Sequence, residues 1–445
     1  MVPDYERPVA PTPAAWPVEA AVSPSAQPVS VAWWQRFGSR ELDGLIAEAM
    51  AANQDLAAAV ARIDQARANA RVAGAPLLPT VDGSGSGRRS YNDIETVTQR
   101  STGYQAVITT SYEIDIWGKN AAGLQGAEAA VDANVYDRDA ILLVLQTDVA
   151  TTYFSILAFQ DRLVIARNNL TAAQELLRLV EVQFEQGAAS ALDVARQKTA
   201  VAAFEAQIPQ LQQQILAAQT SLAILLGRAP GSDIVEAETL QSLALPAIAP
   251  GQPSSLLERR PDIARTEANL KSADADIGAA RAAFYPSITL SASAGIEGVA
   301  TGGASALASL VAGLVQPIFT AGRLEGELDF TKARRVELAA NYRQTVLTAF
   351  KETIDALSAV NTSEARHGLL RSAAESAAEA YRLADLNYRS GAADFLTVLD
   401  AQRTLLASQD SVVQSELDRY SAAASLFKAL GGGWQLPQVA SAATP

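Results

Sequence analysis

Leu396 and Asp400 form the pair whose residue types and spacing most directly suggest a function. They stand four residues apart in a predicted helix, so their side chains lie on one face. In a symmetric assembly each would form a ring, one apolar and one of carboxylates, which could close a passage or hold cations. Because pairs with this spacing are common, an equally acceptable interpretation places Leu396 in the core of a helical hairpin and leaves Asp400 solvated.

Catalytic chemistry is poorly represented in the sequence. There is no Cys, and His367 is the single His. This composition removes thiolate zinc sites, disulfides and cysteine nucleophiles, and almost removes catalysis by histidine. His367 stands in mid-helix without metal-ligand partners and is predicted to be a solvated surface residue. We therefore expect no enzyme activity, no metal site and no cofactor.

Two further motifs have structural interpretations. The RRPD sequence at 259–262 is predicted to start a helix, with Pro261 as the first helical residue. The three glycines at 431–433 follow a helix and lack the strand–loop–helix context of a phosphate-binding loop, so they are expected to end that helix.

The overall charge and hydropathy narrow the class of protein. The sequence has 48 acidic and 35 basic residues and a net charge of −13, which argues against a nucleic-acid partner. No run of 18 apolar residues occurs, so no transmembrane helix is expected, although membrane β-strands give a much weaker signal. No signal peptide is recognisable, and the opening MVPDYERP is interpreted as a mature start with Met1 added.

The sequence contains an internal repeat that includes the long helical patterns. Residues 183–198 (QFEQGAASALDVARQK) and 387–402 (NYRSGAADFLTVLDAQ) match without gaps at an offset of 204 residues. In each copy a Gly ends one helix in the left-handed conformation, and a capping residue begins the next. These turns are Gly187 with Ser190, and Gly391 with Asp394. The chain is therefore a duplicated unit built on tight helical hairpins.

Strand patterns precede each helical hairpin. Alternation with a period of two predicts one strand hairpin at 80–117 and another at 286–319. Four strands cannot close a barrel on their own, and their edges need partners. The simplest closure is a symmetric homo-oligomer in which strands complete a barrel and helices complete a tube.

The helical patterns are unusually long. No proline occurs from 119 to 185 or from 323 to 389, and a helix of this length would extend roughly 100 Å. An earlier helix, with a break near Asn53, is expected to bury the stripe Val60, Ile63, Ala66 and Ala70. The predicted order is an extended strap (1–38), a short helix (39–79), the first strand hairpin (80–117), the first long helical hairpin (118–227), an equatorial linker (228–255), a second short helix (256–285), the second strand hairpin (286–319), the second long helical hairpin (320–431) and a tail (432–445).

Six stretches carry a resemblance to a known family: VPDYERP, LLERRPDIARTEANL, GAARAAFYPSITLSASAG, PIFTAGR, LTVLDAQR and LFKALGGGW. The chain resembles the TolC/OprM family of outer-membrane efflux proteins, close to its NodT-type lipoprotein branch. The resemblance implies a mainly α-helical protein with a membrane β-barrel. It implies a homotrimer in which twelve strands form one barrel in the bacterial outer membrane and twelve helices form a tunnel in the periplasm.

Members of this branch carry a lipidated Cys just before the stretch similar to VPDYERP. This sequence has Met1 at that place and no Cys. The resemblance thus implies a native N-terminal lipid anchor whose attachment residue this sequence lacks.

The resemblance also implies a role for Leu396 and Asp400. The family positions that match Leu396 and Asp400 form the closed periplasmic end of the tunnel. Three carboxylates around one axis repel, so the closed state is expected to need support from Tyr388, Arg389 and Arg403. The first hairpin departs from this pattern with Asp193 and Arg196, so the two hairpins are expected to play unequal parts.

The function implied is passive export of drugs or other small molecules, delivered by an inner-membrane pump through a periplasmic adaptor. The adaptor is expected to contact the hairpin tips, at Gly187, Ser190, Gly391 and Asp394. Lipid of the outer membrane is expected to contact the aromatic residues Tyr91, Tyr104, Tyr112 and Trp117, which in isolation are equally well explained as ordinary strand aromatics. Two alternatives remain, an outer-membrane channel for type I protein secretion and a soluble coiled-coil scaffold.

Overall fold

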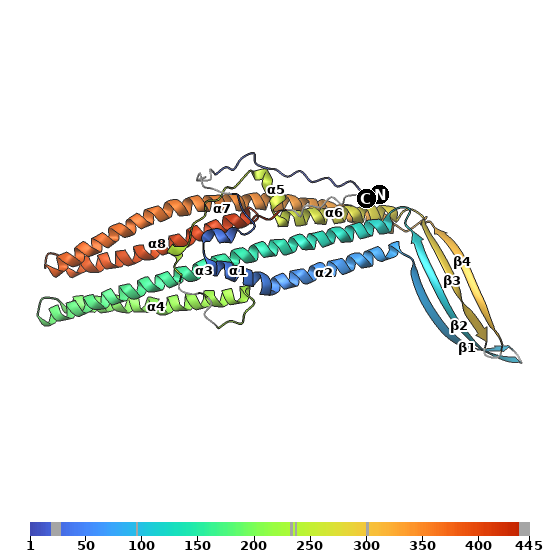
Figure 1. The fold of residues 1–445 in the computed structure, drawn as a ribbon, viewed down its shortest axis with the longest axis horizontal. Coiled ribbons are helices and arrows are strands. Elements are labelled where there is room, and N and C mark those ends of the chain that lie inside the picture. The colour runs from blue at the N-terminus through green and yellow to red at the C-terminus, as the bar shows by residue number, and fades with distance from the viewer. Residues whose placement is uncertain (19–27, 95–96, 232–234, 236–237, 300–301, 436–445) are drawn as a thin grey trace. The chain divides into compact units, whose positions relative to one another are not determined.

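The computed structural model describes residues 1–18, 28–94, 97–231, 235, 238–299 and 302–435 (Figure 1). The chain divides into two compact units. The first, here called the strand unit, comprises Met1–Ala10, Ala59–Asp137 and Asp262–Thr345. The second, the hairpin unit, comprises Pro11–Ala58, Arg138–Pro261 and Val346–Pro445.

The strand unit contains one antiparallel sheet with the strand order β1-β2-β3-β4 (Figure 1). Its strands are β1 (Thr80–Ile94), β2 (Val97–Ile114), β3 (Ser287–Val299) and β4 (Ala304–Val315). Each half of the sequence contributes one strand hairpin, as predicted. Within the described chain β1 and β4 are the edges of the sheet, and the outer side of each has no strand partner.

Helices continue from the ends of these strands. The strand unit includes most of α2 (Gln54–Gly74), the 3₁₀ turn η2 (Ala75–Leu77), α6 (Pro261–Ala282) and the opening parts of α3 (Lys119–Glu185) and α7 (Arg323–Arg389). The N-terminal strap lies against α6. Arg7 Nε is 2.6 Å from Glu267 Oε1, and a Cβ on Gly278 would approach Val2 Cγ2 to 2.5 Å.

The hairpin unit is almost wholly helical. It contains α1 (Arg40–Ala52), α4 (Ala191–Leu225), α5 (Leu256–Arg259), α8 (Phe395–Ala429) and the remaining parts of α3 and α7. Three 3₁₀ turns join them, η1 (Trp33–Phe37), η3 (Leu240–Ser242) and η4 (Pro253–Ser255). The predicted ends of both long helices and the starts of both returning helices are confirmed.

The predicted break at Asn53 is also confirmed, and its physical cause is a double role of one side chain. Asn53 Oδ1 accepts the backbone N–H of Leu56 at 3.0 Å and so caps α2. Its Nδ2 donates to the carbonyl of Leu225 at 3.0 Å, which satisfies an orphan acceptor at the end of α4.

An aromatic cluster forms the core of the hairpin unit. Trp33 stacks on Phe427 with ring centroids 5.0 Å apart, and Phe37 lies 4.9 Å from Phe154. The three glycines at 431–433 end α8 as predicted, with positive φ at each. Gly433 has φ 73°, and a Cβ there would overlap the backbone of Ser30.

Some predicted boundaries and burials are wrong. β2 ends at Ile114 rather than Trp117, because Asp115 turns to cap α3 by accepting the N–H groups of Asn120 and Ala121 at 3.1 and 2.7 Å. β4 ends at Val315, whereas the prediction extended it to position 319. Pro317 has no N–H to donate to the neighbouring strand, so the strand cannot continue through it.

The buried stripe of α2 differs from the prediction at its two ends. Ala59, Ile63 and Ala66 are buried, whereas Val60 is 46% exposed and Ala70 is half-buried. The period of the stripe was predicted correctly, but its first member was not.

One described helix, α3, is long and apolar enough to cross a membrane by length and composition. Such a helix was not expected from the sequence, because the sequence contains no uninterrupted run of 18 apolar residues. Half of the apolar window is buried inside the chain, and Tyr153, Phe154 and Ile156 of α3 are fully buried. These features are those of a core helix, and composition alone does not place α3 in a membrane.

Candidate functional site

The two hairpin tips have nearly identical backbones. Gly187 has φ 76° and Gly391 has φ 78°, both left-handed. The residue after each glycine donates a backbone hydrogen bond of 2.7 Å, from Ala188 to the carbonyl of residue 183 and from Ala392 to that of residue 387. The predicted glycine turns are therefore confirmed, and their contact with an adaptor stays a prediction.

The residues that begin the returning helices also act as predicted. Ser190 and Asp193 form a reciprocal capping box, with the Ser190 N–H 3.1 Å from Asp193 Oδ2. Asp394 caps α8 by accepting the N–H of Thr397 at 2.8 Å. Hydrogen bonds from the hydroxyl and N–H of Thr397 lower the pKa of Asp394. Asp193, which departs from the second-hairpin pattern, thus has a local structural role.

Four helices share one core near the tips. Its buried members are Ala173, Leu176, Val180, Ala200, Phe204, Ala384, Tyr388, Phe395, Val398 and Leu399. They come from α3, α4, α7 and α8, so the two hairpins are packed together as one bundle. Movement of one hairpin away from the other would expose this core.

Leu396 and Asp400 face away from that core. Leu396 is 52% exposed and Asp400 is exposed, whereas the intervening Val398 and Leu399 are buried. The interpretation of Leu396 as a core residue of the hairpin is therefore wrong for the single chain. Leu192, at the equivalent position of the first hairpin, is 57% exposed.

The three residues expected to support the pair have different surroundings. Tyr388 is buried, and its hydroxyl donates to Gln183 Oε1 at 2.5 Å. Burial, with a smaller effect of the Asp193 charge, raises the pKa of Tyr388. Arg389 pairs instead with Asp385 one turn earlier, at 2.8 Å.

Arg403 is exposed and makes no hydrogen bond or ion pair with any described residue. It lies on the same face of α8 as Asp400, one turn farther from the tip. Of the three supporting residues, only Tyr388 joins the two hairpins within one chain.

Two other contacts join the hairpins away from the tips. Arg162 of α3 donates from Nε and Nη2 to the two carboxylate oxygens of Asp410 of α8, at 2.6 and 3.2 Å. Asn169 Nδ2 donates to Gln409 Oε1 at 3.1 Å. No local pattern in the sequence indicates these pairs, because their members are more than 200 residues apart.

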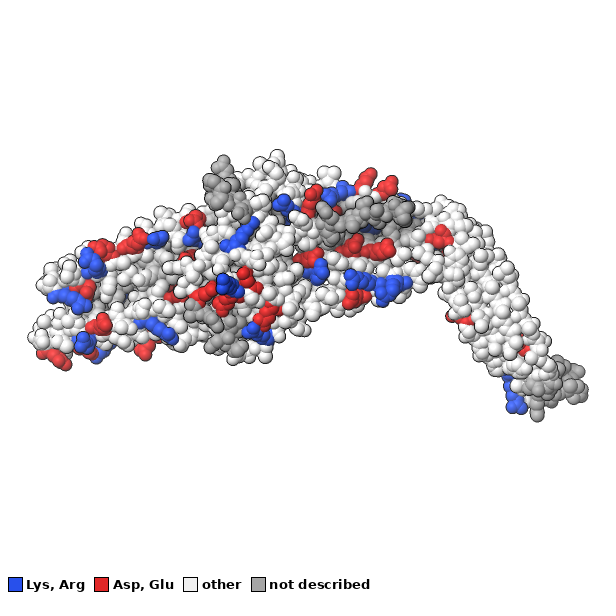
Figure 2. Space-filling view, in the orientation of Figure 1, with Lys and Arg blue, Asp and Glu red and all other residues white. Residues whose placement is uncertain are grey.

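One face of the sheet is mainly apolar, apart from Arg89 toward the far end of β1, and the other is mainly polar with a few aliphatic residues; they are called the apolar and the polar face. The residues Ile108, Tyr112, Leu290, Ile296, Leu310 and Leu314 lie on the apolar face by their pairing register. The charged residues Asp82, Arg88, Glu113 and Glu297 lie on the other face. In the view of Figure 2, charged side chains are scattered over the helices and sparse over the strands.

One pair of β2 and β3 on the polar face leaves no room for a side chain on β3. Gly295 pairs with Val107. A Cβ on Gly295 would overlap the carbonyl oxygen of Ala106 and approach Val107 Cα to 2.9 Å. The strand spacing at this point requires glycine.

Tyr104 and Tyr112 lie on the apolar face, eight residues apart on β2. This separation is about 26 Å along a strand. At the 35–45° tilt of barrel strands it corresponds to roughly 20 Å of height, most of the ~25 Å apolar band of membrane barrels. Tyr104 covers Gly298, whose Cβ would lie 2.5 Å from the Tyr104 hydroxyl. Tyr91 is 59% exposed, and the Arg89 guanidinium lies 5.5 Å from its ring.

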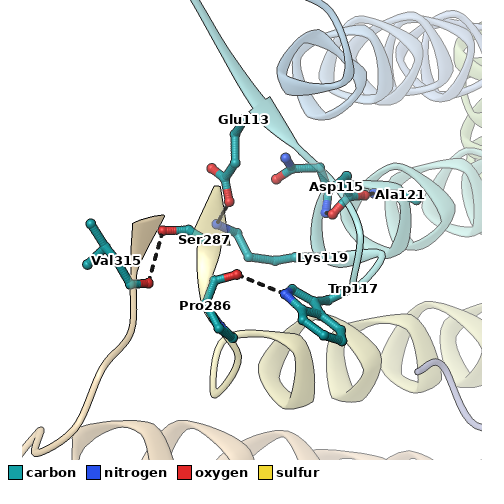
Figure 3. A network of polar contacts seen from close by, with 9 residues as sticks. Glu113, Asp115, Trp117, Lys119, Ala121, Pro286, Ser287 and Val315 are labelled. Atoms are coloured by element: carbon teal, nitrogen blue, oxygen red, sulfur yellow. Dashed lines mark hydrogen bonds and ion pairs between the residues drawn. The ribbon is translucent and has the colours of Figure 1, made fainter. Parts of the chain in front are cut away.

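Trp117 lies after β2, where the sheet meets the helices (Figure 3). Its Nε1 donates to the carbonyl of Pro286 at 2.8 Å, and its ring stacks on Tyr285 at 4.7 Å. Nearby, Lys119 donates to Glu113 at 3.0 Å. Trp117 therefore joins the two strand hairpins, a role that the alternating pattern did not indicate.

Arg260 has a role that the helix-start interpretation of RRPD missed. Pro261 is the first residue of α6, as predicted. Arg260 itself is 8% exposed. Its Nη2 donates to Glu352 at 2.8 Å, and its Nη1 donates to the carbonyl of Ala429 at 3.2 Å. It thereby satisfies an acceptor at the end of α8.

His367 is half-buried rather than fully solvated. Its Nδ1 lies 3.0 Å from Ser415 Oγ, and burial lowers its pKa, with the Arg419 charge acting in the same direction. Among the residues that the structure describes, no group of three or more His, Asp or Glu side chains is placed to hold a metal ion.

A sheet with one apolar face, joined to paired long helices, defines the class of outer-membrane efflux channels. The chain superposes on the outer-membrane channel OprN with a TM-score of 0.90 and 29% identity, covering 98% of this chain and 99% of that one. It superposes on the open state of the Neisseria gonorrhoeae MtrE outer membrane channel with a TM-score of 0.88 and 27% identity, covering 98% of each chain.

The chain belongs to the outer membrane efflux protein family, whose model matches residues 45–228 and 252–432. It is 41% identical to the pyoverdine export outer membrane protein OpmQ of Pseudomonas aeruginosa, over 91% of this chain and 87% of that one. It is 35% identical to the toluene efflux pump outer membrane protein TtgC of Pseudomonas putida, over 100% of this chain and 96% of that one. The resemblance inferred from the sequence is confirmed, and the protein is an outer-membrane component of efflux.

Proposed function

We propose that three copies of the chain form the exit duct of a tripartite efflux system, with a twelve-strand barrel in the outer membrane and a twelve-helix tunnel in the periplasm. The observation that carries this proposal is the four-stranded sheet with one apolar face and two unpaired edges. An unpaired edge favours pairing with another chain, and a closed ring of three sheets would leave no edge within lipid.

The apolar face would contact lipid, and the polar face would line the duct. Tyr104 and Tyr112 would lie near the two boundaries of the apolar band. Trp117 would lie beyond the band, on the side of the helices. This orientation keeps Asp82, Glu297 and the other charged residues of the polar face away from lipid.

Leu396 and Asp400 are proposed to close the periplasmic end of the tunnel. Both are exposed in the single chain, although they stand on a helix whose neighbouring residues are buried. Three Asp400 carboxylates would repel each other by about 1 kcal/mol per pair at 4 Å in water, so other contacts must hold the closed state. The Tyr388–Gln183 hydrogen bond is one such contact.

The partners proposed are a periplasmic adaptor at the tips and an inner-membrane pump that supplies the energy. The tip residues Gly187, Ser190, Gly391 and Asp394 are exposed. The cargo is proposed to be small organic molecules, because the curated relatives are named for pyoverdine export and for toluene efflux. These names favour small-molecule export over type I protein secretion and over a soluble scaffold.

Two measurements test the proposal. Light scattering of the purified protein in mild detergent is expected to give a trimer, and a folded monomer would refute the architecture. In planar bilayers, Leu396→Ala is expected to raise the resting conductance because it removes the apolar ring. Leu192→Ala is the matched control, since Leu192 has similar exposure at the equivalent site of the first hairpin. Equal effects of both substitutions, or no effect of either, would show that Leu396 is not the constriction.

A further inference from the structure

A groove opens between α4 and α8, with α3 as its floor. It has a volume of about 550 Å³, within the range of small-molecule sites. The apolar part of its lining includes Ile165, Phe204, Leu211 and Leu406. The polar part includes three glutamines of α4, Gln207, Gln210 and Gln214, which follow one another at spacings of three and four residues and so share one helix face.

The groove and the proposed gate lie on one stripe of α8. The stripe runs through Leu396, Asp400, Arg403, Ala407 and Asp410, at successive spacings of four, three, four and three residues. Residues with these spacings face the same direction from a helix. The last three line the groove, so a gate formed by the first two would place the groove on the inner wall of the duct, its centre about 16 Å from Leu396 along α8.

The charges in the groove favour an anion. The lining includes two guanidinium groups, of Arg162 and Arg403, and one carboxylate, of Asp410. Arg162 is held by both oxygens of Asp410, whereas Arg403 is exposed and has no partner among the described residues. Asp400 lies one turn nearer the tip and would repel an anion there.

We propose that this groove is a binding site for amphipathic organic anions within the duct, with Arg403 pairing with the anionic group. The apolar floor would hold the body of the molecule, and the glutamine amides would hydrogen-bond its polar substituents. The proposal rests on the proposed function, because it takes Leu396 and Asp400 to face the duct.

Binding is tested with two aromatic probes of similar size and opposite charge, 1-naphthoate and 1-naphthylmethylammonium. Titration calorimetry on the trimer in lipid nanodiscs is expected to show at least tenfold tighter binding of 1-naphthoate. Arg403→Gln and the double substitution Gln207→Leu with Gln210→Leu should each weaken 1-naphthoate binding about tenfold. The double substitution separates binding in the groove from effects on the gate, because Gln207 and Gln210 are not part of the proposed gate, whereas Arg403 is expected to support it.

Arg178→Gln is the matched control and should leave the affinity unchanged. Arg178 is an exposed arginine of α3, about 160° around the helix from Arg162. Equal affinity for the two probes, or an unchanged affinity in either groove variant, would overturn the proposal.

The position within the duct is tested with one introduced thiol. Because the sequence has no Cys, Ala407→Cys would place a single reactive group in the groove. Its reaction with a methanethiosulfonate that carries a sulfonate should be several-fold faster than with one that carries a trimethylammonium group, and 1-naphthoate should slow it. The attached group should reduce the single-channel current.

Modification that leaves the current unchanged would place the groove outside the duct and overturn the proposal. A trimer that conducts but binds neither probe would refute this site and leave the proposed function intact. A preparation that neither trimerises nor conducts would refute the proposed function itself.

Discussion

The hydroxyl of Tyr388 on α7 donates a 2.5 Å hydrogen bond to Oε1 of Gln183 on α3. The two residues stand 205 positions apart, near the tips of different hairpins. The bond is therefore a direct connection that must break if the second hairpin moves away from the first.

Tyr388→Phe should raise the resting conductance of the trimer. A hydrogen bond of this kind contributes about 1 kcal/mol, which corresponds to roughly a fivefold change in a closed-to-open equilibrium. Tyr381→Phe is the control, because Tyr381 packs against the same core and its hydroxyl has no hydrogen-bond partner among the described residues. An unchanged conductance in a folded Tyr388→Phe trimer would rule out a role for this bond in closure.

Two glycines with similar backbone angles should respond differently to alanine. Gly391 has φ 78° and nothing within 4 Å of the position that a Cβ would take, whereas a Cβ on Gly433 would overlap the backbone of Ser30. Gly391→Ala should reduce the free energy of unfolding by about 1–2 kcal/mol, from backbone strain alone. Gly433→Ala should reduce it by about 3 kcal/mol or more, because overpacking is added. Chemical denaturation measures both, and equal losses would contradict this explanation.

The pH dependence of stability should report on Glu416, which is 8% exposed. Burial raises the pKa of Glu416, and the charge of Asp161 acts in the same direction. The charges of Arg419 and Arg371 and a hydrogen bond from Gln241 act in the opposite direction but are smaller. The stability gained from a raised carboxyl pKa is present below the unfolded pKa and is lost as the pH rises through the folded pKa.

Glu416→Gln, which cannot ionise, should therefore gain stability relative to the unsubstituted protein as the pH rises from about 4 through the raised folded pKa. Denaturant unfolding at a series of pH values measures the difference between the two free energies of unfolding. Two parallel curves would show that the carboxyl group of Glu416 titrates alike in the folded and unfolded chains.

Trp117 should stabilise the junction of the two strand hairpins through its indole N–H. Trp117→Phe removes the hydrogen bond to Pro286 and should cost about 1 kcal/mol. Trp117→Ala also removes the stacking on Tyr285 and should cost about 3 kcal/mol or more. Thermal unfolding of the detergent-solubilised protein measures both. A residue that only anchors the protein in lipid would show no such difference between the two substitutions in detergent.

The features that depend on neighbouring residues could be predicted from the sequence. The ends of α3 and α7 were predicted correctly, because the glycine that ends each helix and the capping residue that follows act locally. The end of β2 was not, since the alternation continues past Ile114 and the competing cap made by Asp115 leaves no periodic signal.

The features that depend on packing between distant segments could not be predicted. Tyr388 with Gln183, and Arg260 with Ala429, are brought together only when the two halves pack. The four-residue spacing of Leu396 and Asp400 also could not show whether Leu396 is exposed, because a core residue can have the same spacing. Burial of its neighbours Val398 and Leu399 decides it.

Gly295 has a consequence for the dimensions of the exit. It holds β2 against β3 at a point where no side chain fits, and a shift of one residue would bring Glu297 and its neighbours of the polar face onto the apolar one. In a closed barrel the diameter follows from the number of strands and their stagger. In the proposed trimer Gly295, present once in each chain, would therefore help to fix the stagger and so the diameter of the barrel, and through it the size of the largest cargo that can leave.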